Sequence, residues 1–498
     1  MNRKFDKSVW SYVVFAVGLL SLKSGTVLAD WPQFRGKNSE GVYQGAPVPT
    51  EFGPTKNRLW TLDVPEGHSS PVIHGGALYL TSCNRAEKTL SVHCIDRQTG
   101  KSKWTKAISV SEFERGHPSF NPASSSPATD GERVVAYFGS YGLVCYDRQG
   151  NLLWEIKMPV TKSYAGNATS PAIVGDKVIL YRGNLVDHYV LAVDKATGKE
   201  IWKVPQQEPF ALELACTSCP VVFEDKLVLH SARSVQALAL DSGKRIWEVK
   251  CATTATSTPV IAGDQVIVAA WNKMGEPALR PRFPTYPELI EKHDSNRDQV
   301  LSKNEYPVMW IFHRPEGAEA PENGATLRFR SVDQNKDGKL SKGEWEIQLK
   351  RMAAFRAGYK THGMLSIPIQ SQGKLQQTNV KTLVEQGVPE VPSPLVHQGL
   401  LYFVKNGGSL SCVDLQTGKR VYRIRTKGKG THYASPVIVN DCLYSFAGDG
   451  QVSIVSVGRN GKVIATNKLD DRVYASPAVK DGVLYVRTHS KLYAFGFK

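Results

Sequence analysis

Two segments of twelve residues near the middle of the chain place oxygen-bearing side chains at the spacing of a Ca²⁺-binding loop. Such a loop uses side-chain oxygens at positions 1, 3 and 5, a backbone carbonyl at position 7, a hydroxyl or bound water at position 9, and a bidentate carboxylate at position 12. In the first segment these positions are held by Asp294, Asn296, Asp298, Val300, Ser302 and Glu305. In the second segment they are held by Asp333, Asn335, Asp337, Lys339, Ser341 and Glu344. Hard cations prefer oxygen cages of this kind, so the sequence predicts two metal sites with calcium as the cofactor.

The two loops differ at position 6, where the chain must turn sharply. The second loop has Gly338 there, whereas the first has Gln299. A β-carbon disfavours the positive φ of this position, so we expect the first loop to bind calcium more weakly. The alternative is that both segments are acidic surface loops that bind no metal.

Helix-compatible segments flank both loops, at residues 286–293, 305–313, 325–332 and 345–359. Leu301 and Leu340 occupy position 8 of the two loops, where paired loops of this type form a short strand pair. The sequence therefore predicts a small α-helical EF-hand pair within residues 272–361.

The rest of the chain carries a repeat of about 40 residues, a period typical of propellers. A hydroxyl residue, once with an extra Cys, precedes Pro and an apolar run at eight places: Ser70-Pro71, Ser126-Pro127, Ser170-Pro171, Ser218-Cys219-Pro220, Thr258-Pro259, Ser393-Pro394, Ser435-Pro436 and Ser476-Pro477. Most units continue with a strand that ends near Asp, a tight turn and a strand with Trp, as from Cys94 to Trp104. Four short strands per unit predict an all-β fold, an eight-bladed β-propeller.

Two irregularities in the repeat predict how the propeller closes and where it is interrupted. The last unit ends at Phe495 after three strands, whereas Arg58 to Val64 matches a fourth strand without the preceding three. We expect this N-terminal strand to complete the last blade, which removes an open sheet edge. The fifth unit is lengthened between Pro259 and Pro394, so the EF-hand pair is an insertion in blade 5.

Several Trp and Cys residues recur at fixed repeat positions, which favours packing over chemistry. The Trp residues share one position and are expected to pack between blades: Trp104, Trp154, Trp202 and Trp247. Cys94, Cys145 and Cys412 stand where other units have Ala, so we interpret them as small buried side chains. Cys216 and Cys219 have the spacing of a redox pair, and a disulfide between Cys216 and Cys251 is a further alternative.

Residues just before the repeated hydroxyl-Pro pair should surround one mouth of the axial channel: His68, Tyr164, Asn167, His432, Tyr433 and Tyr474. The alternative is that they are loop residues bonded to backbone. Because strand directions alternate, the connection between strands two and three lies on the same face, and the insertion is expected above this mouth.

The N-terminal 29 residues have a basic start, an apolar stretch and a small-residue exit, which predicts a cleaved signal peptide. The predicted layout is a signal peptide at 1–29, propeller at 30–271, insertion at 272–361 and propeller at 362–498. With 41% hydrophobic residues the chain can bury a full core, and no later run predicts a membrane span. The net charge of +16 favours acidic partners, but without a dense basic run we expect no nucleic-acid partner.

The Ala/Cys-x-Asp-x-x-Thr-Gly-Lys-x-x-Trp repeats and the segment Trp31-Pro-Gln-Phe-Arg-Gly36 resemble the quinoprotein (PQQ-like) eight-bladed β-propeller repeat family. The resemblance covers residues 30–271 and 362–498. It implies either a quinone-dependent alcohol or sugar dehydrogenase, which uses PQQ and Ca²⁺, or a non-catalytic scaffold such as the outer-membrane protein assembly factor. Dehydrogenases of this family often carry two adjacent Cys residues, and this sequence has no such pair.

The family's base and calcium ligands also find no match in the blades. We therefore expect a secreted or periplasmic, calcium-binding scaffold with protein or other envelope partners, without catalytic residues and without PQQ. The alternative is a divergent PQQ-dependent dehydrogenase.

Overall fold

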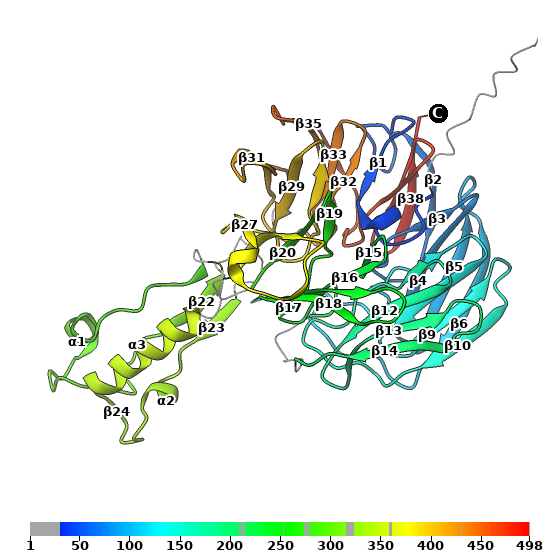
Figure 1. Ribbon diagram of the computed structural model, residues 1–498. Helices are drawn as coiled ribbons and strands as arrows, with labels where there is room; N and C mark the ends of the chain where they lie inside the picture. Colours follow the sequence, from blue (N-terminus) through cyan, green and yellow to red (C-terminus); the bar gives the residue numbers. More distant parts are fainter. Residues whose placement is uncertain are drawn as a thin grey trace, which may run out of the picture.

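The computed structural model describes residues 30–497 apart from 209, 211–214, 252, 273–275, 277–278, 315–322, 358–360 and 429. Eight antiparallel sheets follow one another around a central axis, which confirms the eight-bladed β-propeller (Figure 1). The predicted signal peptide at 1–29 lies outside the described residues. Within the described part, no helix is long and apolar enough to cross a membrane.

Each blade is a four-stranded unit, and two of the sheets gain a fifth strand. Blades 1 and 2 contain β3 (Val72–His74), β4 (Ala77–Asn84), β5 (Thr89–Asp96), β6 (Ser102–Ser109), β7 (Ala128–Thr129), β8 (Arg133–Phe138), β9 (Gly142–Asp147) and β10 (Leu152–Lys157). Blades 3 and 4 contain β11 (Ala172–Val174), β12 (Lys177–Gly183), β13 (His188–Asp194), β14 (Glu200–Pro205), β15 (Val221–Phe223), β16 (Lys226–Ser231), β17 (Ser234–Ala239) and β18 (Arg245–Lys250).

The second half of the ring follows the same plan. Blades 5 and 6 contain β19 (Val260–Ala262), β20 (Gln265–Ala270), β25 (Gly363–Pro368), β27 (Lys381–Val384), β28 (Leu395–His397), β29 (Leu400–Lys405), β30 (Ser409–Asp414) and β31 (Arg420–Arg425). Blades 7 and 8 contain β32 (Val437–Val439), β33 (Cys442–Phe446), β34 (Gln451–Ser456), β35 (Val463–Lys468), β36 (Ala478–Lys480), β37 (Val483–Arg487), β38 (Lys491–Phe495) and β2 (Arg58–Asp63).

The N-terminal strand closes the ring as the sequence predicts. β2 pairs antiparallel with β38, with Trp60 opposite Ala494. The segment before it passes through the centre, where the 3₁₀ turn η1 (Lys37–Ser39) precedes β1 (Val42–Tyr43), and β1 pairs parallel with the innermost strand β32. Each end of the chain is therefore locked by strands distant in sequence.

The Asp turn and the Trp strand interlock neighbouring blades. The Asp96 carboxylate accepts hydrogen bonds from the backbone of Gln98 and Thr99, and Gly100 takes a φ of 72°, which glycine adopts without strain. The Trp60 indole lies against Gly100 and donates to the carbonyl of Arg97 at 3.0 Å. The same bond links Trp104 to Arg148, Trp154 to Lys195, Trp202 to Leu240 and Trp247 to Ile369. The predicted packing role of these Trp residues is confirmed.

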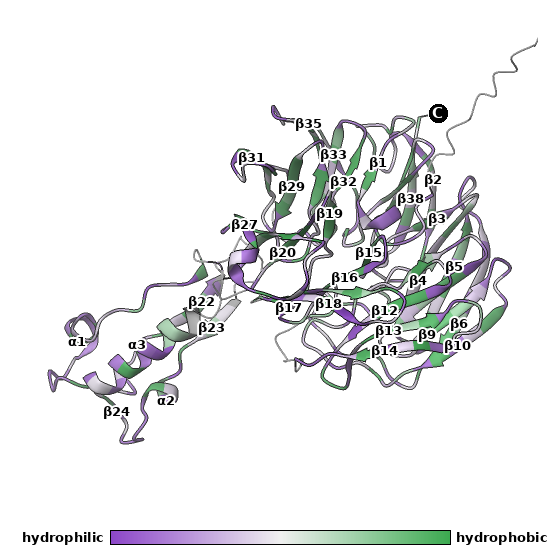
Figure 2. Ribbon diagram, in the orientation of Figure 1, coloured by the Kyte–Doolittle hydropathy of each residue, from purple (hydrophilic) through white to green (hydrophobic). Residues whose placement is uncertain are grey.

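Apolar side chains concentrate along the blade strands, whereas the insertion is more hydrophilic (Figure 2). The insertion leaves β20 after Ala270 and returns at β25. It contains α1 (Tyr286–His293), β21 (Leu301–Ser302), β22 (Trp310–Arg314), β23 (Asn323–Thr326), α2 (Phe329–Val332), β24 (Lys339–Leu340) and α3 (Lys342–Ala357). Its own apolar cluster includes Leu289, Leu301, Val332 and Trp345.

The helix prediction for the insertion is only partly right. α1 and α3 match, and Leu301 pairs with Leu340 as expected. The predicted helix at 305–313 is wrong, because Pro307 follows the first loop and the chain then forms the hairpin of β22 and β23. The predicted helix at 325–332 is reduced to the four residues of α2. An EF-hand pair with four full helices is therefore not what this segment forms.

Candidate functional site

A closed ring of eight hydrogen bonds surrounds the axis where the innermost strands begin. In each bond, the backbone N–H of one blade's hydroxyl or thiol residue donates to the side chain of the next blade's residue. The ring runs through Ser70, Ser126, Ser170, Cys219, Thr258, Ser393, Ser435 and Ser476, with distances of 2.8 to 3.3 Å. In blade 4 the ring position belongs to Cys219 and not to the hydroxyl residue Ser218, which corrects the sequence assignment.

A cavity of about 260 Å³ lies above this ring. The residue two positions before each ring member lines it in every blade: His68, Ser124, Ala168, Thr217, Thr256, Val391, Tyr433 and Tyr474. Blades 7, 8 and 1 thus contribute an aromatic arc, in which Tyr474 meets Tyr433 at 5.2 Å and His68 at 5.0 Å between ring centres. At this position the other blades contribute small or hydroxyl side chains, although aromatic rings from other positions, such as Tyr164 and Trp271, also line the cavity. The cavity can therefore both stack and hydrogen-bond a ligand.

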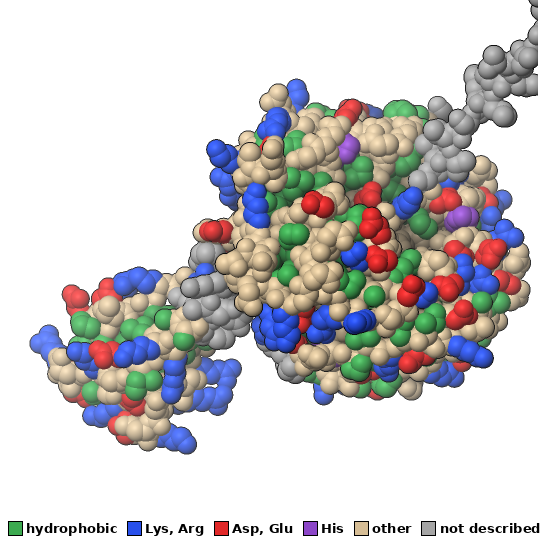
Figure 3. Space-filling model, viewed as in Figure 1, with side chains coloured by type: hydrophobic (Ala, Val, Ile, Leu, Met, Phe, Trp, Pro, Cys, Tyr) green, Lys and Arg blue, Asp and Glu red, His purple; other side chains and the backbone are tan. Residues whose placement is uncertain are grey.

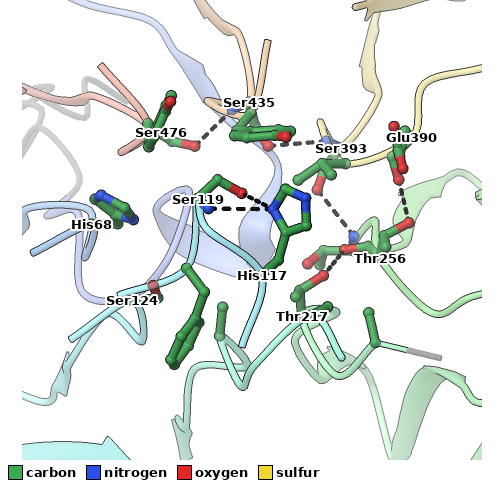
Figure 4. A pocket seen from close by; sticks show the side chains of 18 of the residues that line it. His68, His117, Ser119, Ser124, Thr217, Thr256, Glu390, Ser393, Ser435 and Ser476 are labelled. Carbon is green, nitrogen blue, oxygen red and sulfur yellow. Dashed lines mark hydrogen bonds between the residues drawn. The ribbon is translucent and has the colours of Figure 1, made fainter. Parts of the chain in front are cut away.

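Among the described residues that line the cavity, Glu390 is the only one with a carboxylate, and none is Lys or Arg. Asn406 donates to this carboxylate at 3.2 Å. Figure 4 shows Glu390 and His68 on opposite sides of the cavity, with Thr256 close to Glu390. Burial and the nearby Arg487 guanidinium lower the pKa of His68 to about 3, so its imidazole is neutral.

The fully buried Arg35 lies below the hydrogen-bonded ring rather than in this cavity. Its guanidinium donates to the carbonyl of Pro394 at 2.7 Å, and Pro394 follows the ring residue Ser393. The residues that line the cavity instead precede the ring positions. The cavity therefore suits a ligand that combines apolar and hydrogen-bonding faces and carries little negative charge.

Four of the six residues predicted at the mouth line the cavity: His68, Tyr164, Tyr433 and Tyr474. The prediction is wrong for Asn167 and His432. Asn167 is buried and donates to the Tyr137 hydroxyl at 2.8 Å, and the His432 side chain is buried behind the loop. These two residues instead fit the stated alternative, in which they are loop residues that form hydrogen bonds within the protein.

Sequence reasoning missed other residues of the cavity, including Phe34, His117, Phe120, Trp271 and Glu390. His117 and Phe120 belong to a long connection outside the repeat pattern. Glu390 and Trp271 had a usable signal, because Glu390 stands three residues before the ring residue Ser393 and Trp271 ends the apolar run that begins at Val266.

The disulfide predicted as an alternative for the cysteines is wrong. All eight are free thiols, so Cys216 and Cys251 form no disulfide. The Cys216 sulfur accepts the backbone N–H of Gly183, and burial raises the pKa of this thiol to about 12. A thiol in that state is a poor nucleophile, which argues against redox chemistry at Cys216.

The second predicted calcium loop, from Asp333 to Glu344, has the backbone that such a site needs. Gly338 takes a φ of 81° and donates its N–H to the Asp333 carboxylate at 3.2 Å. The other oxygen of Asp333, Oδ1, is buried without a hydrogen-bond partner. Glu344 accepts hydrogen bonds from the backbone of Gln334 and Ser341, so its carboxylate turns back over the loop. The orphaned Asp333 oxygen fits a cation ligand.

The first loop has the same path but a less favourable geometry. Gln299 takes a φ of 65° at position 6, where the second loop has Gly338, whereas Arg297 and Lys336 share a positive φ at position 4 of the two loops. Lys339 of the second loop approaches the Asp298 carboxylate at 3.5 Å. Within the described residues, no group of three or more His, Cys, Asp or Glu side chains converges as a metal site.

The insertion does not lie over the cavity, which corrects the predicted placement. Trp271 and Glu390 show that blade 5 opens on the mouth face, but no described residue of the insertion lines the cavity. Figures 1 and 3 show the insertion as a separate lobe that projects from the propeller near blade 5. At its base, the buried Glu276 carboxylate contacts His362 at 3.3 Å and Lys405 at 3.8 Å, so the two ends of the insertion are held together.

Known proteins similar to the chain include the outer membrane protein assembly factor BamB of Yersinia pestis. It is 27% identical over 280 residues, which cover 51% of this chain and 66% of that protein. The serine/threonine-protein kinase AfsK of Streptomyces griseus is 29% identical over 164 residues, 31% of this chain and 18% of the kinase. The chain thus spans less than two thirds of the length of these relatives.

Solved structures show the same fold at low identity. BamB from Moraxella catarrhalis matches with a TM-score of 0.53 and 11% identity, covering 88% of this chain and 99% of that chain. A europium-containing methanol dehydrogenase matches with a TM-score of 0.55 and 13% identity, covering 94% and 98%.

The family described as outer membrane protein assembly factor BamB matches residues 48–210, 186–280 and 406–496, most of the propeller. This chain belongs to that repeat family.

Proposed function

We propose that this chain is an exported, non-catalytic propeller that binds protein partners in the cell envelope or outside the cell. The family match and the BamB relatives support an envelope role, because those proteins are described as outer membrane assembly factors. The +16 charge favours partners with acidic surfaces.

The observation that carries the non-catalytic assignment is the lining of the axial cavity. PQQ is a tricarboxylate, and a dehydrogenase holds it together with Ca²⁺, so its site needs cationic side chains and several oxygen ligands. Of the described residues that line the cavity, Glu390 is the only acid and none is Lys or Arg. These residues do not fit the quinone, and we assign no catalytic residue to them.

The experiment is reconstitution of the purified chain that begins at residue 30, called the mature chain below, with PQQ and Ca²⁺. We expect no quinone uptake by absorbance and no dye-linked oxidation of methanol, ethanol or glucose, while a quinoprotein alcohol dehydrogenase assayed in parallel turns over. Turnover above the dye-only control would instead establish the alternative, a divergent PQQ-dependent alcohol or sugar dehydrogenase. Fractionation of cells that express the tagged chain tests the location, and recovery in the cytosolic fraction would contradict it.

The insertion adds a calcium-binding function to this proposal. Support comes from the oxygen donors of both loops, from the positive φ at Gly338 and from the orphaned, buried Oδ1 of Asp333. A cation there would replace the backbone hydrogen bonds of Glu344 with direct ligation. The distance of the insertion from the cavity favours calcium as a stabiliser of this lobe rather than as a participant at the propeller mouth.

A further inference from the structure

Aromatic rings fill most interfaces between neighbouring blades. Each of these aromatic side chains comes from the fourth strand of one blade and covers the tight turn of the next blade. A β-carbon placed on Gly100, Gly150 or Gly198 would lie only 2.7 to 2.9 Å from the indole of the preceding blade. Trp202 covers Gly243 in the same way, and the Tyr422 ring covers Gly461.

The remaining interfaces differ in what replaces the ring. Between blades 7 and 8, the N-terminal segment packs instead, with Phe52 against Phe495 at 4.7 Å between ring centres. Between blades 5 and 6, the turn glycine is Gly418, with a φ of 71° like its counterparts. A β-carbon on Gly418 would meet nothing closer than the backbone of Leu383 at 3.7 Å. The same turn is present, but its aromatic cover is absent.

The course of the chain explains the missing ring. After β25 the chain forms β26 (Gly373–Leu375), which pairs in parallel with β18 of blade 4, and passes through the 3₁₀ turn η3 (Gln377–Asn379). Only the four residues of β27 then remain as the fourth strand of blade 5. Leu383 stands in this strand, and a cavity of about 130 Å³ remains between the two blades.

The walls and rim of this interblade slot have different chemistry. Leu383, Phe403 and Val413 form apolar walls, and the slot is also lined by Arg420 and Arg423. Both arginines are exposed. The Arg423 guanidinium donates to the Ser409 hydroxyl at 2.6 Å, which fixes its position at the rim. Basic side chains gather over the region of β31 in Figure 3.

We propose that the slot between blades 5 and 6 is a docking site for a protein partner that inserts an aromatic side chain flanked by a carboxylate. The occupied interfaces show which group this geometry accepts, because an indole fills the equivalent space in blades 1 to 4 and 8. The two arginines select for acid beside that ring, since Arg binds carboxylates bidentately. This inference rests on the proposed role of the chain as a binder of proteins.

The direct test uses two short peptides as probes, acetyl-Asp-Trp-Asp-amide and acetyl-Lys-Trp-Lys-amide, with saturation-transfer NMR on the mature chain. We expect saturable binding of the acidic peptide only. Charge reversal of the rim by Arg420→Glu with Arg423→Glu should weaken it about tenfold or more, as expected for loss of paired charges. The matched control, Lys419→Glu with Lys427→Glu, changes the net charge equally but leaves the slot lining intact. Equal binding of the two peptides, or equal effects of the two double variants, would overturn the proposal.

The second test fills the slot from within by Leu383→Trp. We expect this variant to abolish binding of the acidic peptide and to raise the melting temperature, whereas Trp154→Leu at an occupied interface should lower it. Retained peptide binding in a folded Leu383→Trp protein would contradict the inference. The outcome is separable from the proposed function: dye-linked turnover would overturn the non-catalytic role without affecting peptide binding, and failure of the peptide would overturn only the slot.

Discussion

The backbone N–H of Ser476 donates to the hydroxyl of Ser70 at 3.0 Å, although the two residues are 406 positions apart. This bond closes the ring of side-chain acceptors around the axis, because each of the other blades bonds its sequence neighbour in the same way. The first and last blades are therefore joined at two places. The hydrogen-bonded ring joins them at the axis, and β2, which pairs with β38 before the chain enters blade 1, joins them at the outer edge.

Loss of this acceptor should destabilise the propeller. Ser70→Ala leaves the N–H of Ser476, a residue with 3% exposure, without its partner in a buried position. An unsatisfied buried donor costs about 1–3 kcal/mol, so we expect a lower urea midpoint. The control is Ser242→Ala in an exposed turn, which should change stability by less than ~0.5 kcal/mol. Equal effects of the two substitutions would show that the ring bond contributes little.

The Trp residues at one repeat position should contribute unequally to stability. Trp247 is fully buried because β26 covers the edge of its strand, and its indole donates to Ile369 at 2.9 Å. Trp104 is only partly buried. We expect Trp247→Ala to cost about 3–5 kcal/mol, as for a buried aromatic ring, and Trp104→Ala to cost less. Calorimetric melting of both variants checks this order, and a larger loss for Trp104→Ala would contradict it.

The fold could be predicted because its determinants are local and repeated. The hydroxyl-Pro starts, the Asp turns and the Trp strands recur, and each has a chemistry that does not depend on distant residues. The closing strand at Arg58 was predictable from its mismatch with the repeat. The choice of Cys219 over Ser218 in the ring also had a signal, because every ring residue directly precedes Pro and Cys219 directly precedes Pro220. The search for a hydroxyl residue at this position missed it.

The cavity and the insertion were harder to predict because non-repeated segments form them. His117 comes from a long connection, and its place depends on how that loop folds back over the axis. In the insertion, the apolar pattern after Glu305 is compatible with a helix, but Pro307 and the pairing of β22 with β23 favour a hairpin. The placement of the lobe depends on packing at its base, around Glu276 and His362, which no sequence pattern records.

Glu114 should make stability fall as the pH rises. Burial raises the pKa of this carboxyl to about 8 from an ordinary value of 4.5, despite a hydrogen bond from Thr161. Because the folded-state pKa lies above the unfolded one, this contribution to stability is complete below pH 4.5 and declines up to about pH 8. Each pH unit in this window removes up to ~1.4 kcal/mol. Glu114→Gln should remain stable across the window, and denaturant unfolding at pH 5 and pH 8 measures the difference. An unchanged pH dependence in the variant would contradict the raised pKa.

Calcium binding should show two events of unequal strength, the tighter one at the loop from Asp333 to Glu344. The reason is that Gly338 takes its positive φ without strain, whereas Gln299 carries a β-carbon at the same position, and Lys339 competes with a cation for Asp298. Glu344→Gln should remove the tighter event and leave the weaker one, and Glu305→Gln should do the reverse. Glu346→Gln is the matched control, because Glu346 lies on the same helix, pairs with Lys342 and is not a loop ligand. Isothermal titration of the mature chain and of the three variants measures these events. A wild-type chain that binds no calcium, or a control that loses the tight event as Glu344→Gln does, would show that the loops are acidic surface segments without a metal.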